Sequence, residues 1–99
     1  MCHNRLLLVG PARELKRFER SDWESQARAR YLDVLECSAT RLSFQFETTT
    51  VPTRYLTNAS RNWPKLTFLI DYEIEELGLK GLAKAHRGAL ETCAVHYPP

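Results

Sequence analysis

Alternating apolar and polar residues predict two strands in this 99-residue chain. Between positions 41 and 50, Leu42, Phe44 and Phe46 alternate with polar residues, and from 66 to 75 every even position is apolar or aromatic. A period of two places successive side chains on opposite faces of a strand. We therefore expect both segments to bury one face and to expose the other.

Two further strands are predicted in the N-terminal half. The apolar run at 4–9 is followed by Gly10-Pro11 and is typical of a strand that is buried on both faces. The segment 31–37 is compatible with a helix or a strand. We favour a strand, because 41–50 then gains a partner across a turn at 38–40.

Helical segments separate these strands. The first starts at Pro11, and it can break and restart at Ser21–Glu24, which has the form of a capping box. The second opens at Pro52 and ends at Pro64, since proline is tolerated in the first turn of a helix and stops a helix later on.

A loop at 76–79 would connect the strand at 66–75 to a following strand. In the resulting antiparallel pair Glu75 faces Lys80 and Asp71 faces Lys84. The acids would then lie on a polar face, each opposite a base.

A second hairpin is predicted around Arg87-Gly88, a common two-residue turn with glycine second. It would set Lys84 opposite Glu91 and Leu82 opposite Cys93. The two hairpins agree on which face of the sheet is polar.

This order of elements predicts an α+β fold. We expect one domain over residues 1–99, a ferredoxin-like split βαβ sandwich with two helices on one face of an antiparallel sheet and a C-terminal β-hairpin extension. The other face of the sheet would stay open, and a partner or ligand would bind there.

Composition is that of an ordinary folded protein, with 43% hydrophobic and 26% charged residues. The apolar runs are far shorter than the roughly 20 residues that a membrane span needs, so we expect no membrane association and a cytoplasmic location. Three cysteines at unrelated spacings predict reduced thiols, and no cofactor is indicated.

Several short motifs resemble the YubB-type ferredoxin-like domain of bacterial, phage and plasmid proteins. They are Asn4-Arg5-Leu6 with Gly10-Pro11, Phe46-Glu47-Thr48 with Pro52, Trp63-Pro64, Leu66–Tyr72 with Glu73, and Gly81 with Arg87-Gly88. The chain departs from that family at Met1-Cys2-His3-Asn4, where the family usually opens with Trp-Cys-x-Asn. The resemblance implies the fold, and it implies no reaction, cofactor or catalytic residue.

Acidic residues on the strand at 66–75 raise the possibility of a metal-dependent enzyme. Asp71, Glu73 and Glu75 would lie about 7 Å apart along one strand face, a spacing at which oxygen ligands can bind a divalent cation. The opposite lysines favour a solvated, charge-paired face instead. We therefore expect neither a catalytic residue nor a metal ligand here.

A cysteine nucleophile is the second enzymatic possibility. His86 and Cys93 would share one sheet face, about two positions apart on that face. Whether they form a reactive pair stays open at this point, because a reactive thiol also needs a lowered pKa and a pocket.

Nucleic-acid binding is the alternative function that we consider. The first helix carries Arg13, Lys16, Arg17 and Arg20, which could contact phosphates. The net charge of the chain is only +2, and mixed charges on a helix usually form a solvated face.

The favoured function is that of a non-catalytic binding or accessory domain that interacts through the open sheet face. A protein partner, or a second copy of the chain in a homodimer, would contact a small apolar patch with a charged rim. The predicted surface consists of Leu69, Asp71, Glu73, Leu82, Lys84, Glu91, Cys93 and Val95.

Overall fold

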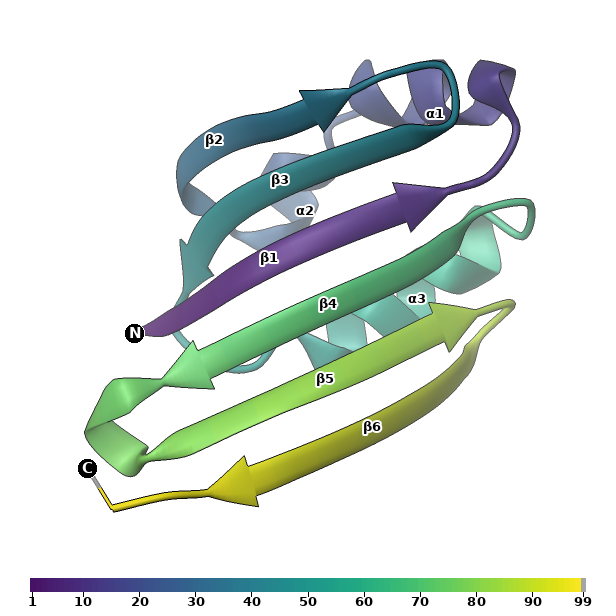
Figure 1. The fold of residues 1–99 in the computed structure, drawn as a ribbon. Coiled ribbons are helices and arrows are strands. Elements are labelled where there is room, and N and C mark those ends of the chain that lie inside the picture. The colour runs from purple at the N-terminus through teal and green to yellow at the C-terminus, as the bar shows by residue number, and fades with distance from the viewer. Residues whose placement is uncertain (99) are drawn as a thin grey trace.

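The computed structural model describes residues 1–98, and in that part of the chain six antiparallel strands form one sheet with three helices (Figure 1). The fold class is α+β. The elements are β1 (Cys2–Val9), α1 (Ala12–Glu19), α2 (Trp23–Ala27), β2 (Arg30–Cys37), β3 (Arg41–Thr48), α3 (Thr53–Asn62), β4 (Thr67–Ile74), the 3-10 turn η1 (Glu75–Leu77), β5 (Leu79–His86) and β6 (Ala89–His96).

The strand order across the sheet is β2-β3-β1-β4-β5-β6. The helices lie behind the sheet in Figure 1, so they cover one face and leave the other open. The first predicted helix is two helices, α1 and α2, because the chain turns at residues 20–22 between them. The strand prediction for 31–37 is confirmed. No helix in residues 1–98 is both long and apolar enough to cross a membrane.

An aromatic cluster joins α1 and α2 to the covered face of the sheet. Trp23 is 2% exposed, and its ring centre lies 4.5 Å from that of Phe44 and 5.5 Å from that of Phe18. Phe18 also meets Phe68 edge-on. Burying rings of this size removes a large apolar area from water, so this cluster holds the two short helices on the sheet.

Helix α3 covers the other half of the same face. Leu56 and Ala59 are the buried apolar residues of this helix. The fully buried Ser60 hydroxyl accepts a hydrogen bond from the Gly88 backbone N–H (2.9 Å) and donates one to the Thr57 carbonyl oxygen (2.9 Å). The bond from Gly88 ties α3 to the turn between β5 and β6.

The β5–β6 hairpin has the predicted register. Lys84 pairs with Glu91 and Leu82 with Cys93 across a turn at Arg87 and Gly88. Both turn residues have positive φ angles, 50° and 83°, as a turn of type I′ requires.

The predicted partners across β4 and β5 are wrong by two residues. Asp71 pairs with Leu82, and Glu73 pairs with Lys80, whereas we expected Asp71 opposite Lys84. The cause is the turn: η1 begins at Glu75, and Gly78 takes a left-handed conformation (φ 60°) that ends it. Moving a loop by one residue moves every cross-strand partner by two, so each side chain keeps its face.

Strand β1 is not buried on both faces, contrary to the prediction from its apolar run. Leu6 and Leu8 are fully buried, whereas Leu7 and Val9 are half-buried and Arg5 is exposed. The difference arises because, within residues 1–98, no helix covers the face to which the odd-numbered residues of β1 point.

Strand β2 differs from the other strands in its irregular pairing. Its register against β3 shifts twice, between Arg30 and Asp33 and between Val34 and Glu36, and Tyr31 has a φ of 54°. Such bulges twist a strand locally and leave residues unpaired. The outer edge of β2 is therefore not a regular hydrogen-bonding edge.

We expect Gly81→Ala to lower the free energy of unfolding by about 1–3 kcal/mol, the usual cost of overpacking a core. A Cβ atom at Gly81 would overlap the ring of Tyr72, which is 5% exposed and lies across it. Urea unfolding followed by circular dichroism measures the change.

The matched control is the same substitution in a Tyr72→Leu background, where the ring is gone. There Gly81→Ala should cost much less, and the difference between the two backgrounds gives the coupling energy. Equal costs in both backgrounds would show that the ring is not the obstacle.

Candidate functional site

The open face of the sheet carries the odd-numbered side chains of β1, β3, β4 and β6 and the even-numbered side chains of β5, in rows that run across the strands. In one row Arg5, Asp71, Leu82 and Cys93 are successive cross-strand neighbours. In the next row Ser43, Leu7, Leu69, Lys84 and Glu91 follow one another. Apolar and charged side chains are therefore interleaved on this face.

A groove of about 480 Å³ lies on these two rows. Leu7 and Leu69 are half-buried in it, and Leu82 is 63% exposed. Charged groups of both signs line the same groove: Arg5, Arg41, Asp71, Lys84 and Glu91. A concave apolar surface with a few polar groups is the usual form of a binding site.

The structure brings most of the predicted partner surface together in this groove. Six of its residues line the groove: Leu69, Asp71, Leu82, Lys84, Glu91 and Cys93. Glu73 and Val95 lie on the same face one row away, since both are neighbours of Lys80 across the sheet.

Other lining residues were missing from the predicted surface. Arg5 and Leu7 come from β1, and Arg41 and Ser43 come from β3. The exposed Arg5 within the apolar run was the available signal that β1 has an open face. The contribution of β3 had no such signal, because it depends on the strand order.

The strand acids have basic neighbours, although not the predicted ones. Asp71 is flanked by Arg5 and Leu82, and Glu73 by His3 and Lys80. Among residues 1–98, no three His, Cys, Asp or Glu side chains come together as a group that could hold a metal ion.

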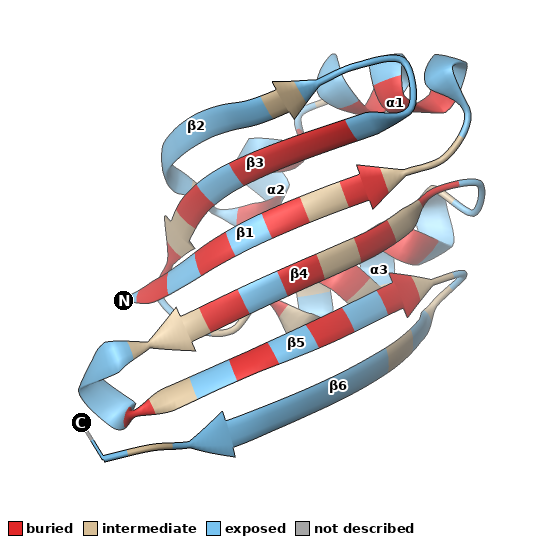
Figure 2. Cartoon of the chain, in the orientation of Figure 1, coloured by how far each residue is buried: buried red, intermediate tan, exposed pale blue. Residues whose placement is uncertain are grey.

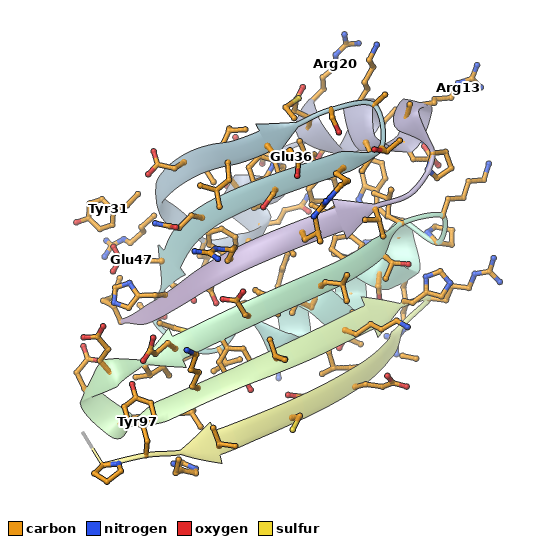
Figure 3. All side chains as sticks on the ribbon, viewed as in Figure 1. Arg13, Arg20, Tyr31, Glu36, Glu47 and Tyr97 are labelled. Carbon is orange, nitrogen blue, oxygen red and sulfur yellow. The ribbon has the colours of Figure 1, made fainter. Side chains whose placement is uncertain are left out.

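Two acids near the end of β4 differ from the expectation of a simple exposed row. Glu75 leaves the strand and begins the η1 turn. Glu73 accepts a hydrogen bond from the Tyr97 hydroxyl, and this bond is the main reason why the pKa of Tyr97 is raised to about 12. Figure 3 shows Tyr97 beside the end of the sheet where β4 and β5 meet the η1 turn.

The structure separates His86 from Cys93. His86 pairs with Ala89, and Cys93 lies four residues further along the strand, which corresponds to about 13 Å. The Nδ1 atom of His86 lies 3.3 Å from the Leu66 carbonyl oxygen and 3.4 Å from the Thr67 hydroxyl. These two residues therefore do not form a Cys–His pair.

The bases of the first helix are not equally available. Arg17 lies over the Trp63 ring at 5.2 Å and forms an ion pair with Glu14 at 2.6 Å. Arg13, Lys16 and Arg20 are exposed, and Figure 3 shows Arg13 and Arg20 extending away from the sheet.

A second, more polar hollow of about 730 Å³ lies on the helical side of the molecule. Its lining includes Arg28, Arg54 and Tyr55. The Tyr55 hydroxyl is buried without a hydrogen-bond partner among residues 1–98, and burial raises the pKa of Tyr55. The open-face groove has the more apolar lining, so we take it as the candidate site.

Comparison with known protein families, with curated proteins and with solved structures finds no match to this chain. Its function is therefore inferred from the geometry of its own residues.

We expect Glu73→Leu, which removes the acceptor of the Tyr97 hydroxyl, to lower the pKa of Tyr97 from about 12 toward the ordinary 10. In the natural chain the folded state favours the neutral phenol of Tyr97. The hydrogen bond from this phenol to Glu73 therefore stabilises the fold below pH 10, and this stabilisation is lost as the pH rises toward 12. NMR titration of the tyrosine ring carbons, with Tyr97→Phe for assignment, measures the change.

Glu75→Leu is the matched control, since Glu75 acts on Tyr97 through its charge and not through a hydrogen bond. It should shift the Tyr97 titration much less. Equal shifts in the two variants would mean that general negative charge, and not the hydrogen bond, holds the proton on Tyr97.

Proposed function

We propose that this protein is a small binding domain without catalysis of its own, which holds a protein partner on the open face of its sheet. The observation that carries the proposal is the groove in the middle of that face, where Leu7, Leu69 and Leu82 lie among charged groups. Exposed apolar surface with a polar rim is typical of protein interaction sites.

Charges of both signs around the groove favour a partner that also carries both. Arg5 and Lys84 lie on the same two rows as Asp71 and Glu91. Charges at the rim of an interface contribute mainly to orientation and specificity, while buried apolar contacts contribute affinity. A partner segment with apolar side chains and flanking acids and bases fits this arrangement.

We further propose that the domain is ferredoxin-like with a β-hairpin extension. Strand β3 lies between β1 and β2, and β1 lies between β3 and β4, so each βαβ unit is split by an inserted antiparallel strand. This order supports a split βαβ arrangement that β5 and β6 extend. The motifs similar to the YubB-type domain agree with that fold.

The exposed free thiols Cys37 and Cys93 fit a location in the reducing cytoplasm.

Binding of nucleic acid has less support than binding of protein. Of the four predicted bases, Arg17 is already paired with Glu14 and lies over the Trp63 ring. The aromatic residues of the central strands, Phe44, Phe46 and Phe68, are buried on the covered face, whereas sheets that bind RNA stack bases on exposed aromatics. The third possibility, a metal-dependent enzyme, is weakened because Glu75 leaves the strand.

We expect Leu82→Asp to abolish partner binding through the open face. Leu82 is 63% exposed in the groove, so the substitution removes apolar contact area and adds charge without disturbing the core. Affinity purification from the source cells with quantitative mass spectrometry would compare the proteins retained by the variant and by the natural chain.

Leu77→Asp is the matched control, because Leu77 is 61% exposed on the η1 turn and does not line the groove. It should retain the same partners as the natural chain. If both variants lose the same proteins, or if neither loses any, the open face is not the binding surface.

A further inference from the structure

The outer edge of β6 has the features of a strand that pairs with another strand. β6 pairs with β5 in unbroken register over all eight residues, and no neighbour covers its other edge within residues 1–98. Figure 2 shows β6 exposed along almost its whole length. Glu91 is its one acidic or strongly basic residue, and it contains neither proline nor a bulge. Charged residues, proline and bulges are what usually protect a strand edge from pairing, and β6 has almost none of them.

The β5–β6 turn determines which backbone N–H and C=O groups of β6 point away from the sheet. Residues that flank a two-residue hairpin turn exchange hydrogen bonds with each other, so Ala89 and every second residue after it point toward β5. The Tyr97 N–H also points to this side, since it donates to the Gly78 carbonyl oxygen at 2.7 Å and Tyr97 continues the same alternation. The residues whose N–H and C=O groups point away from the sheet are Leu90, Thr92, Ala94 and His96.

The opposite edge of the sheet does not offer such an array. The two register shifts of β2 and the positive φ of Tyr31 break the regular spacing of its backbone groups. Pairing of one copy with another is therefore favoured at β6.

We propose that two copies of this chain pair through their β6 strands, antiparallel and about a two-fold axis that passes through Cys93. In this register Leu90 faces His96 of the second copy, and Thr92 faces Ala94 of the second copy. All four outward residues of each strand then exchange backbone hydrogen bonds. A register centred on Thr92 or on Ala94 leaves one of these residues of each copy unpaired within the strand.

The side chains are compatible with this register. Glu91 faces Val95 of the second copy, so the two acids do not oppose each other. Cys93 faces Cys93 of the second copy, and Leu82 lies beside Cys93 in each copy. A short apolar row would therefore cross the two-fold axis and join the two open-face grooves.

The geometry gives a specific chemical test of the register. Directly opposite residues that do not exchange hydrogen bonds have Cα atoms about 4.5 Å apart, within the range that a disulfide spans. Oxygen with copper phenanthroline as catalyst would take the two electrons from the two Cys93 thiols and release their protons. A Cys37→Ser chain, which keeps Cys93 exposed, should then form a covalent dimer. A Cys93→Ser chain, which keeps Cys37, should not.

Sedimentation of the reduced protein tests the association itself. We expect a species of twice the monomer mass of 11.5 kDa. Ala94→Pro removes an outward N–H and places its ring against the second strand, so it should raise the dimer dissociation constant by about tenfold or more. Ala94→Ser keeps the N–H and should still dimerise. Circular dichroism checks that both variants fold.

A folded natural chain that stays monomeric at high concentration would overturn the proposal. So would a dimer that resists oxidation through Cys93 or that forms equally well with Ala94→Pro. Partner capture at the groove, tested by Leu82→Asp, is a separate measurement, so failure of the edge pairing leaves that result intact.

Discussion

The structure depends on helices that bury only one face of a sheet whose side chains alternate between two faces. On the covered face, the aromatic cluster around Trp23 and Phe18 holds α1 and α2, while Leu56 and Ser60 hold α3. Because the pleat assigns each residue to one face, the same alternation that builds the core also presents Leu7, Leu69 and Leu82 to the open side. The groove is thus a direct product of the way in which the core is built.

Much of this arrangement could be predicted from local patterns. The alternation at 41–50 and 66–75 identified the faces of β3 and β4, and Arg87-Gly88 identified the β5–β6 hairpin together with its register. Turn residues with positive φ carry a strong local signal, because few residues other than glycine adopt it. The local signal for the position of the β4–β5 turn was weaker. Gly78 could stand inside the loop or end it, and only the second choice places Asp71 opposite Leu82.

The candidate site was predictable where it is built from strands that follow one another in the chain. Leu69, Leu82 and Cys93 lie on β4, β5 and β6, which are joined by short turns, so their proximity follows from hairpin geometry. The contributions of Arg5 and Ser43 could not be predicted in the same way. They require β1 to lie between β3 and β4, an order that comes from the expected split βαβ topology and not from any hairpin.

The contrast between the two edges of the sheet limits how far an assembly could grow. A regular strand at both edges would let copies add head to tail without end, as in a fibre. Here the bulged pairing of β2 removes one of the two edges. A contact between two β6 strands would close on itself and leave an irregular β2 at each outer end, so the same irregularity that breaks the register of β2 would stop further copies from adding.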